Sequence, residues 1–299
     1  MHLTLAVSSG ELQAFCMLDP EHERTVLAWR EARIARLTAR DGWLSLIGKA
    51  FLQPGVPLSV GSAADSGVQL PGDKAPAALG SVELREGRVH FTPAAGASML
   101  LSRAGAEPTP LTAARALVSD AAGRADRLQY GEITLDVMER ASTFAVRVRD
   151  LSRARPEFAG LEYYPIDDAW RLPARFEPYT PERSIELVYD GDLALPFAAP
   201  GALVFEKDGV PYRVDPVFES DRKRLWLVFA DPTNRDSTYG AGRFLYAPLP
   251  EGDRVVLDFN QAFNPPCAFS PFVACPLPPF QNRLQLRVEA GEKRPLEHT

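Results

Sequence analysis

The sequence is poor in the two residue types on which most metal sites and many catalytic sites depend. Its 299 residues include 4 histidines and 3 cysteines, and no histidine lies near Cys267 or Cys275 in the sequence. A tetrahedral zinc site takes four ligands, so these two cysteines alone are insufficient. We therefore expect no metal and no cofactor. Acid–base chemistry would have to rest on Asp, Glu, Tyr or Arg.

Motifs that identify several common enzyme classes are also missing. The chain has no glycine-rich phosphate loop, no dinucleotide-binding fingerprint, no Gly-x-Ser-x-Gly turn and no His-Glu-x-x-His pair. These absences argue against the common nucleotide-binding proteins, serine hydrolases and zinc proteases. The formal net charge of −6 argues against a nucleic-acid partner, which needs a basic protein face.

Long apolar runs are absent as well. No stretch approaches the roughly 20 apolar residues that span a bilayer. The first residues lack the positive region and the apolar length of a signal peptide, and three cysteines do not indicate a disulfide framework. We expect a cytoplasmic protein with reduced thiols and no membrane partner, and we leave its oligomeric state open.

What is present indicates a mainly β protein, with 45% hydrophobic and 24% charged residues as in an ordinary globular chain. We expect an N-terminal helix followed by two antiparallel β lobes, each a sandwich or an open barrel. The expected parts are an N-terminal strand/helix segment (1–50), a first β lobe (51–150), a connecting segment (151–181), a second β lobe with the candidate site (182–293) and a loose tail (294–299).

The helix is expected from about Asp19 to Arg40, because Asp19 is a good N-cap and Pro20 suits the first helical position. Arg33, Arg36 and Arg40 fall on the side opposite its apolar stripe. We interpret that side as a solvated face, with an anion-binding edge as the alternative.

In the first lobe, short strands alternate with glycine and proline turns. Leu58-Ser-Val-Gly-Ser, followed by a polar loop and a short apolar strand, resembles the start of a forkhead-associated sandwich. The arginine, serine and histidine with which that family binds phosphothreonine are absent at the expected spacing. The resemblance therefore implies a shape and not phosphopeptide binding.

The second lobe is expected to consist of consecutive strands, among them a central strand from Leu225 to Ala230 that is apolar on both faces. The expected strands are Ser184–Tyr189, Ala202–Glu206, Val210–Asp215, Leu225–Ala230, Arg243–Ala247, Arg254–Asn260 and Arg283–Glu289.

Our candidate site lies at the end of the strand 254–260. Side chains alternate along a strand, so Asp258 and Asn260 point away from the apolar face and lie together at its C-terminal end. Arg243 follows Gly240-Ala-Gly242, where a ligand or a neighbouring backbone can approach closely. Its guanidinium would hold an anion or would form a structural pair with Asp258.

Further candidates surround this strand end. Asp231 lies in an oxygen-rich turn whose spacing does not match a calcium loop, and Tyr239 and Asn264 lie beside the expected site. Six prolines between Pro265 and Pro279 make the following loop stiff, as in a preformed wall or lid. The predicted ligand-binding set comprises Asp231, Tyr239, Arg243, Asp258, Asn260 and Asn264.

The cysteines of this loop allow more than one interpretation. Cys267 and Cys275 would pack as small apolar residues or form a disulfide. Less favoured alternatives are a zinc site and a cysteine nucleophile with His90 as its base.

Across most of its length the chain resembles the bacterial and archaeal family of domain of unknown function 1684. The matching pieces include Trp43-Leu-Ser-Leu-Ile-Gly, Thr238-Tyr-Gly-Ala-Gly-Arg-Phe-Leu, Leu257-Asp-Phe-Asn, Asn264-Pro-Pro-Cys-Ala-Phe and Cys275-Pro-Leu-Pro-Pro. The resemblance implies no activity.

We therefore keep three hypotheses for function. The first is a binding module in the second lobe for a small polar or anionic molecule. The second is a hydrolase or lyase with Asp258 as general base and Arg243 holding an oxyanion. The third is an interaction protein in which these polar residues are architectural.

Overall fold

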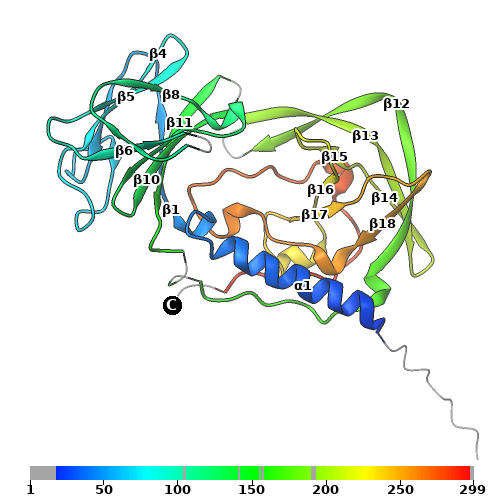
Figure 1. The fold of residues 1–299 in the computed structure, drawn as a ribbon. Helices are drawn as coiled ribbons and strands as arrows, with labels where there is room; N and C mark the ends of the chain where they lie inside the picture. Colours follow the sequence, from blue (N-terminus) through cyan, green and yellow to red (C-terminus); the bar gives the residue numbers. More distant parts are fainter. Residues whose placement is uncertain are drawn as a thin grey trace, which may run out of the picture.

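A computed structural model describes residues 18–103, 106–140, 142–154, 156, 158–189 and 193–296 of the chain. The fold is mainly β, with one N-terminal α-helix and two β lobes, as the sequence indicated (Figure 1). Cys16, the Asp190-Gly191 turn and the last three residues lie outside the described residues. No helix in the described part of the chain is long and apolar enough to cross a membrane.

Helix α1 spans Pro20–Leu37, and its start is set by the Asp19 side chain, which accepts a hydrogen bond from the backbone N–H of Glu21. The helix lies across the second lobe (Figure 1). Its buried residues are His22, Val26, Arg33 and Leu37, so one arginine of the expected solvated face lies in the interior. That part of the prediction is wrong.

The first lobe is a sandwich of two sheets. One sheet has six strands in the order β1-β11-β10-β9-β6-β7, and the other has five in the order β3-β2-β4-β5-β8. The pairings are antiparallel except for β2 with β3. The strands are β1 (Leu46–Leu52), β2 (Leu58–Gly61), β3 (Val68–Gln69), β4 (Gly80–Arg85), β5 (Arg88–Pro93), β6 (Met99–Ser102), β7 (Thr109–Leu111), β8 (Arg115–Leu117), β9 (Arg127–Tyr130), β10 (Ile133–Arg140) and β11 (Thr143–Asp150).

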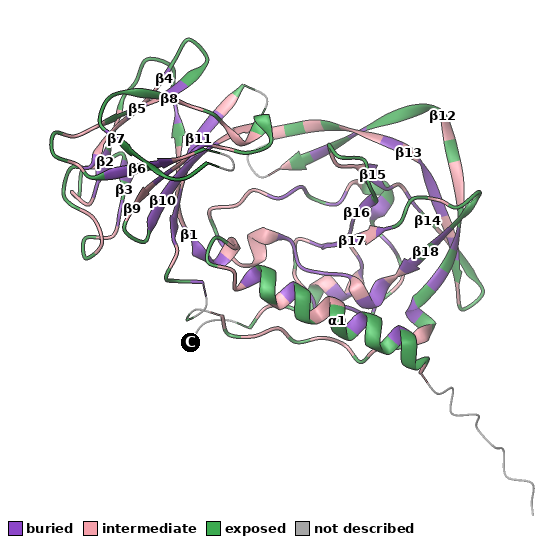
Figure 2. Cartoon of the chain, in the orientation of Figure 1, coloured by how far each residue is buried: buried purple, intermediate pink, exposed green. Residues whose placement is uncertain are grey.

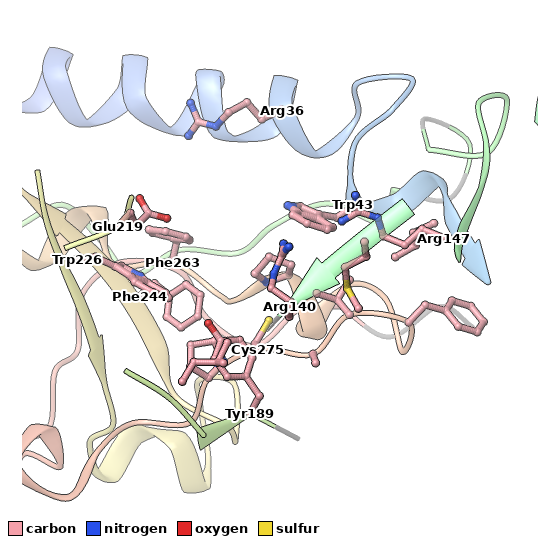
Figure 3. Close-up of a pocket in the computed structure, with 18 of the residues that line it drawn as sticks. Arg36, Trp43, Arg140, Arg147, Tyr189, Glu219, Trp226, Phe244, Phe263 and Cys275 are labelled. Atoms are coloured by element: carbon pink, nitrogen blue, oxygen red, sulfur yellow. The ribbon is translucent and has the colours of Figure 1, made fainter. Parts of the chain in front are cut away.

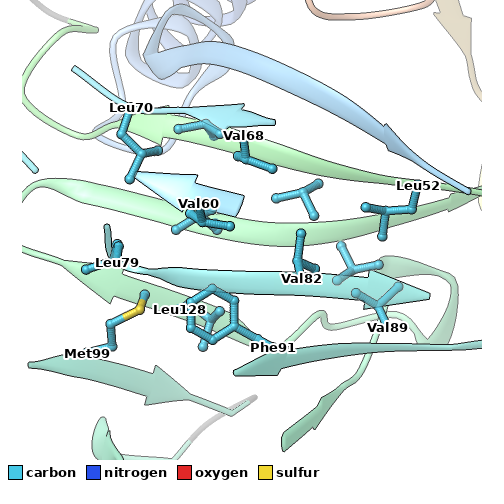
Figure 4. Close-up of a cluster of buried hydrophobic side chains, with 14 of the residues drawn as sticks. Leu52, Val60, Val68, Leu70, Leu79, Val82, Val89, Phe91, Met99 and Leu128 are labelled. Atoms are coloured by element: carbon cyan, nitrogen blue, oxygen red, sulfur yellow. The ribbon is translucent and has the colours of Figure 1, made fainter. Parts of the chain in front are cut away.

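The two sheets of the first lobe pack face to face through one apolar core. Figure 4 shows Leu52, Met99 and Leu128 of the six-stranded sheet facing Val60 and Phe91 of the five-stranded sheet. Alternating apolar residues on both sheets produce this packing, because every second side chain of a strand points to the same face.

The second lobe is built from a curled four-stranded sheet, β14-β13-β12-β18, and a three-stranded sheet, β15-β16-β17. The long strands β12 and β13 arch over the lobe (Figure 1). The strands are β12 (Arg171–Tyr189), β13 (Leu193–Lys207), β14 (Val210–Val214), β15 (Val217–Phe218), β16 (Leu225–Phe229), β17 (Arg243–Ala247) and β18 (Arg254–Asp258). The 3₁₀ turns are η1 (Trp43–Ser45), η2 (Asp120–Ala122), η3 (Asp168–Trp170), η4 (Pro232–Arg235), η5 (Phe259–Gln261), η6 (Pro266–Ala268) and η7 (Phe280–Asn282).

Strand β16 is buried along its whole length and is the middle strand of its sheet, which confirms the expectation from its two apolar faces (Figure 2). Two other expectations differ from the structure. Strand β12 begins at Arg171, inside the segment that we expected to connect the lobes. Residues 283–289 form no strand, although Leu284 and Val288 are buried as the alternation indicated.

Candidate functional site

Arg243 lies in a closed interior network. Its side chain is 0% exposed and pairs with Asp231 at 3.1 Å. It also donates to the backbone carbonyls of Val288, at 2.8 Å, and Ala290. Burial lowers the pKa of the guanidinium, and the charge of Asp231 opposes this shift. The expected pair with Asp258 is not formed, and Arg243 instead holds the segment after residue 283 against the sheet.

This network explains the missing last strand. The guanidinium binds the carbonyls of Val288 and Ala290, and the Asp231 carboxylate accepts the Val288 N–H at 2.8 Å. The backbone groups of Val288 and Ala290 that would hydrogen-bond to a neighbouring strand are therefore bound by buried side chains. The close approach expected near the glycines is also present at Gly242, where a Cβ would lie 2.5 Å from Pro278.

Asp258 belongs to a different network, centred on His22 of α1. The His22 Nε2 atom lies 2.9 Å from Asp258 Oδ2, and its Nδ1 atom bonds to Asp168 of η3. The Asn260 side chain donates to Asp258 at 2.9 Å, and Gln261 does so at 3.1 Å. The apolar face expected for β18 is confirmed, but no local pattern indicated that a helix histidine would meet this carboxylate.

Asn264 belongs to a third network. Its backbone carbonyl accepts from Arg33 at 2.8 Å, and its backbone N–H donates to Glu292 at 2.8 Å. Arg33 and Glu292 pair at 2.8 Å in the interior. Tyr239, the remaining candidate, donates to the carbonyl of Cys267 at 3.3 Å. The structure therefore distributes the six predicted residues over separate hydrogen-bonded networks.

A cavity of about 1230 Å³ lies between the two lobes, beneath α1. The first lobe contributes β1, β10 and β11, and the second contributes β16, β17 and the loop after residue 264. Figure 3 shows Trp226, Phe244 and Phe263 at one side of the cavity and Trp43 with Arg147 at the other. None of the six predicted residues lines it.

Aromatic side chains form much of its wall. They are Trp29, Trp43, Phe51, Tyr189, Trp226, Phe244, Tyr246, Phe263 and Phe272. Several are fixed against one another edge to face. The ring centroids of Trp226 and Phe244 are 5.1 Å apart at 87°, and those of Phe244 and Phe263 are 5.8 Å apart at 90°. This preformed apolar surface is typical of small-molecule sites.

The charges on the wall are mainly positive. Among the described residues, the cations are Arg33, Arg36, Lys49, Arg140, Arg147 and Arg224, and one carboxylate, that of Glu219, lines the cavity with them. Several are already paired: Arg140 and Arg147 bind carboxylates outside the cavity, and Arg33 binds Glu292. Arg224 lies 3.6 Å from Glu219 and its guanidinium covers the Tyr246 ring at 3.3 Å.

Arg36 differs from the other arginines of the wall. It has no ion pair or hydrogen bond with the residues that the structure describes. Burial, followed by the charges of Arg33 and Arg224, lowers its pKa. Arg36 is nevertheless exposed overall, so solvent reaches its guanidinium, and a bound anion would replace that water with paired, charge-assisted hydrogen bonds.

One neutral donor in the wall also lacks a partner. Trp226 is 6% exposed, and its indole Nε1 has no hydrogen bond within the described part of the chain. A buried donor without a partner costs about 1–3 kcal/mol, so a ligand acceptor reaching it would remove that cost.

The proline-rich loop forms part of this wall, as expected from its stiffness. Pro266 and the run from Phe272 to Pro276 line the cavity. Cys275 faces it from below in Figure 3. We expected this loop to cover the end of β18, but its residues face the space between the lobes.

A second cavity of about 510 Å³ lies on the far side of Tyr246 and Gln261, which line both hollows. Its other residues include Asp19, His22 and Asp258. Within the described ranges, no cluster of His, Cys, Asp or Glu has the geometry to hold a metal.

Comparison with known proteins gives a family but no activity. The protein-family model described as "Protein of unknown function (DUF1684)" matches residues 156–293. A solution NMR structure of an uncharacterized protein of Haloarcula marismortui is 33% identical, covering 48% of this chain and 82% of that one, with a TM-score of 0.40. No curated protein matches the sequence.

Proposed function

Because the chain belongs to DUF1684, a family of proteins of unknown function, we propose a function from its geometry: it binds a small organic anion with an apolar body in the cavity between the lobes. The observation that carries this proposal is Arg36, a cation without a partner beside a preformed aromatic wall. We place the binding protein in the cytoplasm, as expected from the sequence.

The composition of the wall favours an amphipathic ligand over a purely polar one. Nine aromatic residues line the cavity, and such side chains bind apolar groups through burial of their surface. The cations select the charge of the ligand, since a guanidinium binds a carboxylate, sulfonate or phosphate by paired hydrogen bonds. In this proposal the acid group lies near Arg36 and Arg224, and the apolar body lies against Trp226 and Phe263.

Tryptophan fluorescence provides a direct test. Three of the 4 tryptophans line the cavity, namely Trp29, Trp43 and Trp226. We expect dodecanoate and anilinonaphthalene sulfonate to change this fluorescence saturably. Dodecanol, which has the same chain without the charge, should bind at least about tenfold more weakly, because hydrogen bonds to charged groups contribute about 1.5–3 kcal/mol.

A pair of matched variants locates the anion. Arg36→Ala should weaken dodecanoate binding about tenfold or more. Arg24→Ala removes the same charge from an exposed position of the same helix that does not line the cavity, and should leave binding unchanged. Equal affinity for dodecanoate and dodecanol, or equal effects of the two variants, would refute an anion site at Arg36.

The hydrolase or lyase alternative has less support. It needs Arg243 and Asp258 at one substrate, but Arg243 is fully enclosed by protein and the two residues belong to separate networks.

A further inference from the structure

Cys267 and Cys275 are brought together at the base of the proline-rich loop. They are eight positions apart, and the Cys267 N–H donates to the sulfur of Cys275 at 3.2 Å. Their side chains are also in contact. Both pack in the same apolar cluster, yet no disulfide joins them.

Hydrogen bonds of the surrounding residues, which do not involve the two thiol groups, hold this part of the loop in place. The Cys267 carbonyl accepts from Tyr239 at 3.3 Å, and the Leu277 N–H donates to the Val188 carbonyl at 2.8 Å. The sulfur of Cys275 lies no more than about 4.7 Å from the Cα atom of Cys267, given the N–Cα bond length. In a disulfide the two sulfurs are directly bonded, and here the Cys275 sulfur already lies against the Cys267 backbone.

The two thiols are not equivalent. Cys275 is 7% exposed, and contact with Cys267 together with burial raises its pKa. Cys267 is only half-buried. A reagent in solution therefore meets Cys267 first, and the thiolate is the form that attacks a disulfide.

We propose that Cys267 and Cys275 form a reversible thiol–disulfide site in the wall of the ligand cavity, with a low-molecular-weight disulfide as the oxidant. The Cys267 thiol gives its proton to solvent, and the thiolate attacks one sulfur of that disulfide, breaks its S–S bond and releases one thiolate. The Cys275 thiol then gives its proton to solvent and its sulfur attacks the Cys267 sulfur, which releases the second thiolate. The two released thiolates take up these two protons. Two protein thiols lose two electrons, and the small disulfide becomes two thiols.

The site has a structural consequence for the cavity. Phe272, Val273 and Ala274 lie between the two cysteines and line the cavity. The same loop reaches the first lobe, because the Ser270 hydroxyl donates to the Leu46 carbonyl at 3.3 Å. Oxidation would therefore close a covalent ring around the part of the wall that contacts both lobes.

The test uses the full chain with Cys16→Ser, which removes the third thiol. The protein is incubated with oxidised glutathione, alkylated, digested with trypsin and analysed by mass spectrometry. Residues 255–283 form one tryptic peptide, because no lysine or arginine lies between Arg254 and Arg283. We expect this peptide to become lighter by two hydrogen atoms, to resist alkylation and to be restored by dithiothreitol.

Single variants test the order of attack. Cys275→Ser should accumulate glutathione on Cys267, because the second step is blocked. Cys267→Ser should leave Cys275 unmodified in the folded protein and expose it to alkylation only in urea. Thermal unfolding of each variant shows whether it is folded, and Cys275→Ala replaces Cys275→Ser if the hydroxyl disturbs the apolar cluster.

The Cys16→Ser protein, which keeps both Cys267 and Cys275, decides the main question. A native protein that retains two alkylatable thiols, or that carries only stable glutathione adducts, overturns the proposal. Faster modification of Cys275 in Cys267→Ser than of Cys267 in Cys275→Ser overturns the order of attack. These results do not depend on the anion site, because no ligand is added.

Discussion

Replacing His22 by glutamine should loosen the N-terminal end of α1 in a pH-dependent way. Both ring nitrogens of His22 meet carboxylates, Asp168 at Nδ1 and Asp258 at Nε2. A neutral imidazole has only one N–H donor, so both hydrogen bonds require the protonated ring. Burial lowers the pKa of His22, but the bonds to Asp168 and Asp258 outweigh it and raise the pKa above the usual 6.5.

The magnitude follows from the burial of the contact with Asp258. The side chain of His22 is 2% exposed and that of Asp258 is 14% exposed. Breaking a fully buried pair costs about 3–5 kcal/mol, whereas an exposed pair contributes about 0–1 kcal/mol. Asp258 keeps its bonds from Asn260 and Gln261. We therefore expect His22→Gln to lower the free energy of unfolding by about 2 kcal/mol in mildly acidic solution.

The sign of the pH dependence is determined by both partners. Because the folded-state pKa of His22 is raised, its contribution is fully present below pH 6.5 and is lost as the pH rises through the higher folded value. The pKa of Asp168 is lowered from 3.8 by the Asp19 N–H and by His22, so its contribution is lost as the pH falls through that lower value. The stability difference between wild type and variant should be greatest between these two limits.

Urea denaturation from about pH 5 to about pH 9 measures this difference. His90→Gln is the matched control, since His90 lies on β5 of the other lobe and has no ion pair in the described structure. The free energy of unfolding of this variant should change with pH in parallel with that of the wild type. If His22→Gln loses stability with rising pH as steeply as the wild type does, the protonated bridge is refuted.

Three other outcomes test the interior. Arg243→Ala should lower the free energy of unfolding by about 3–5 kcal/mol, because it leaves buried acceptors without a donor. Urea denaturation measures the loss. A change within about 0.5 kcal/mol contradicts the closed network. Gly242→Ala should cost more than about 1 kcal/mol, since φ is +97° and the new Cβ would meet Pro278; an unchanged midpoint refutes the close approach. Oxidation of Cys267 and Cys275 should stabilise the folded chain by about 2.6 kcal/mol, as loop closure over this segment implies, and denaturation with and without dithiothreitol measures it.

Much of the fold follows from local patterns in the sequence. Asp19 and Pro20 mark the start of α1, and the two apolar faces of β16 indicate its central place. The segment after residue 283 shows where local patterns mislead, because its alternation fits a strand. The partner that binds its carbonyls, Arg243, lies far away in the sequence. The order of the strands in the sheet, which no local pattern shows, brings Arg243 beside these carbonyls.

The candidate site was harder to predict for the same reason. Sequence reasoning singled out the proline-rich loop, since stiffness is a local property, but assigned it to the end of β18. It did not find the cavity, whose residues come from α1, from β1 and β11 of the first lobe and from β16 and β17 of the second. No spacing in the sequence connects Arg36 with Trp226. Both line the cavity because α1 packs across the second lobe.

The arginines along one side of helix α1 have two different roles. Arg30 donates to the Tyr164 carbonyl at 2.9 Å, and Arg33 pairs with Glu292 in the interior. Both charges are therefore used to attach the helix to the second lobe, and Arg36 comes next along the same side. Among the described residues, the lobe pairs a carboxylate with Arg33 but none with Arg36. In the proposed function this difference leaves Arg36 available to bind the acid group of a ligand in the cavity.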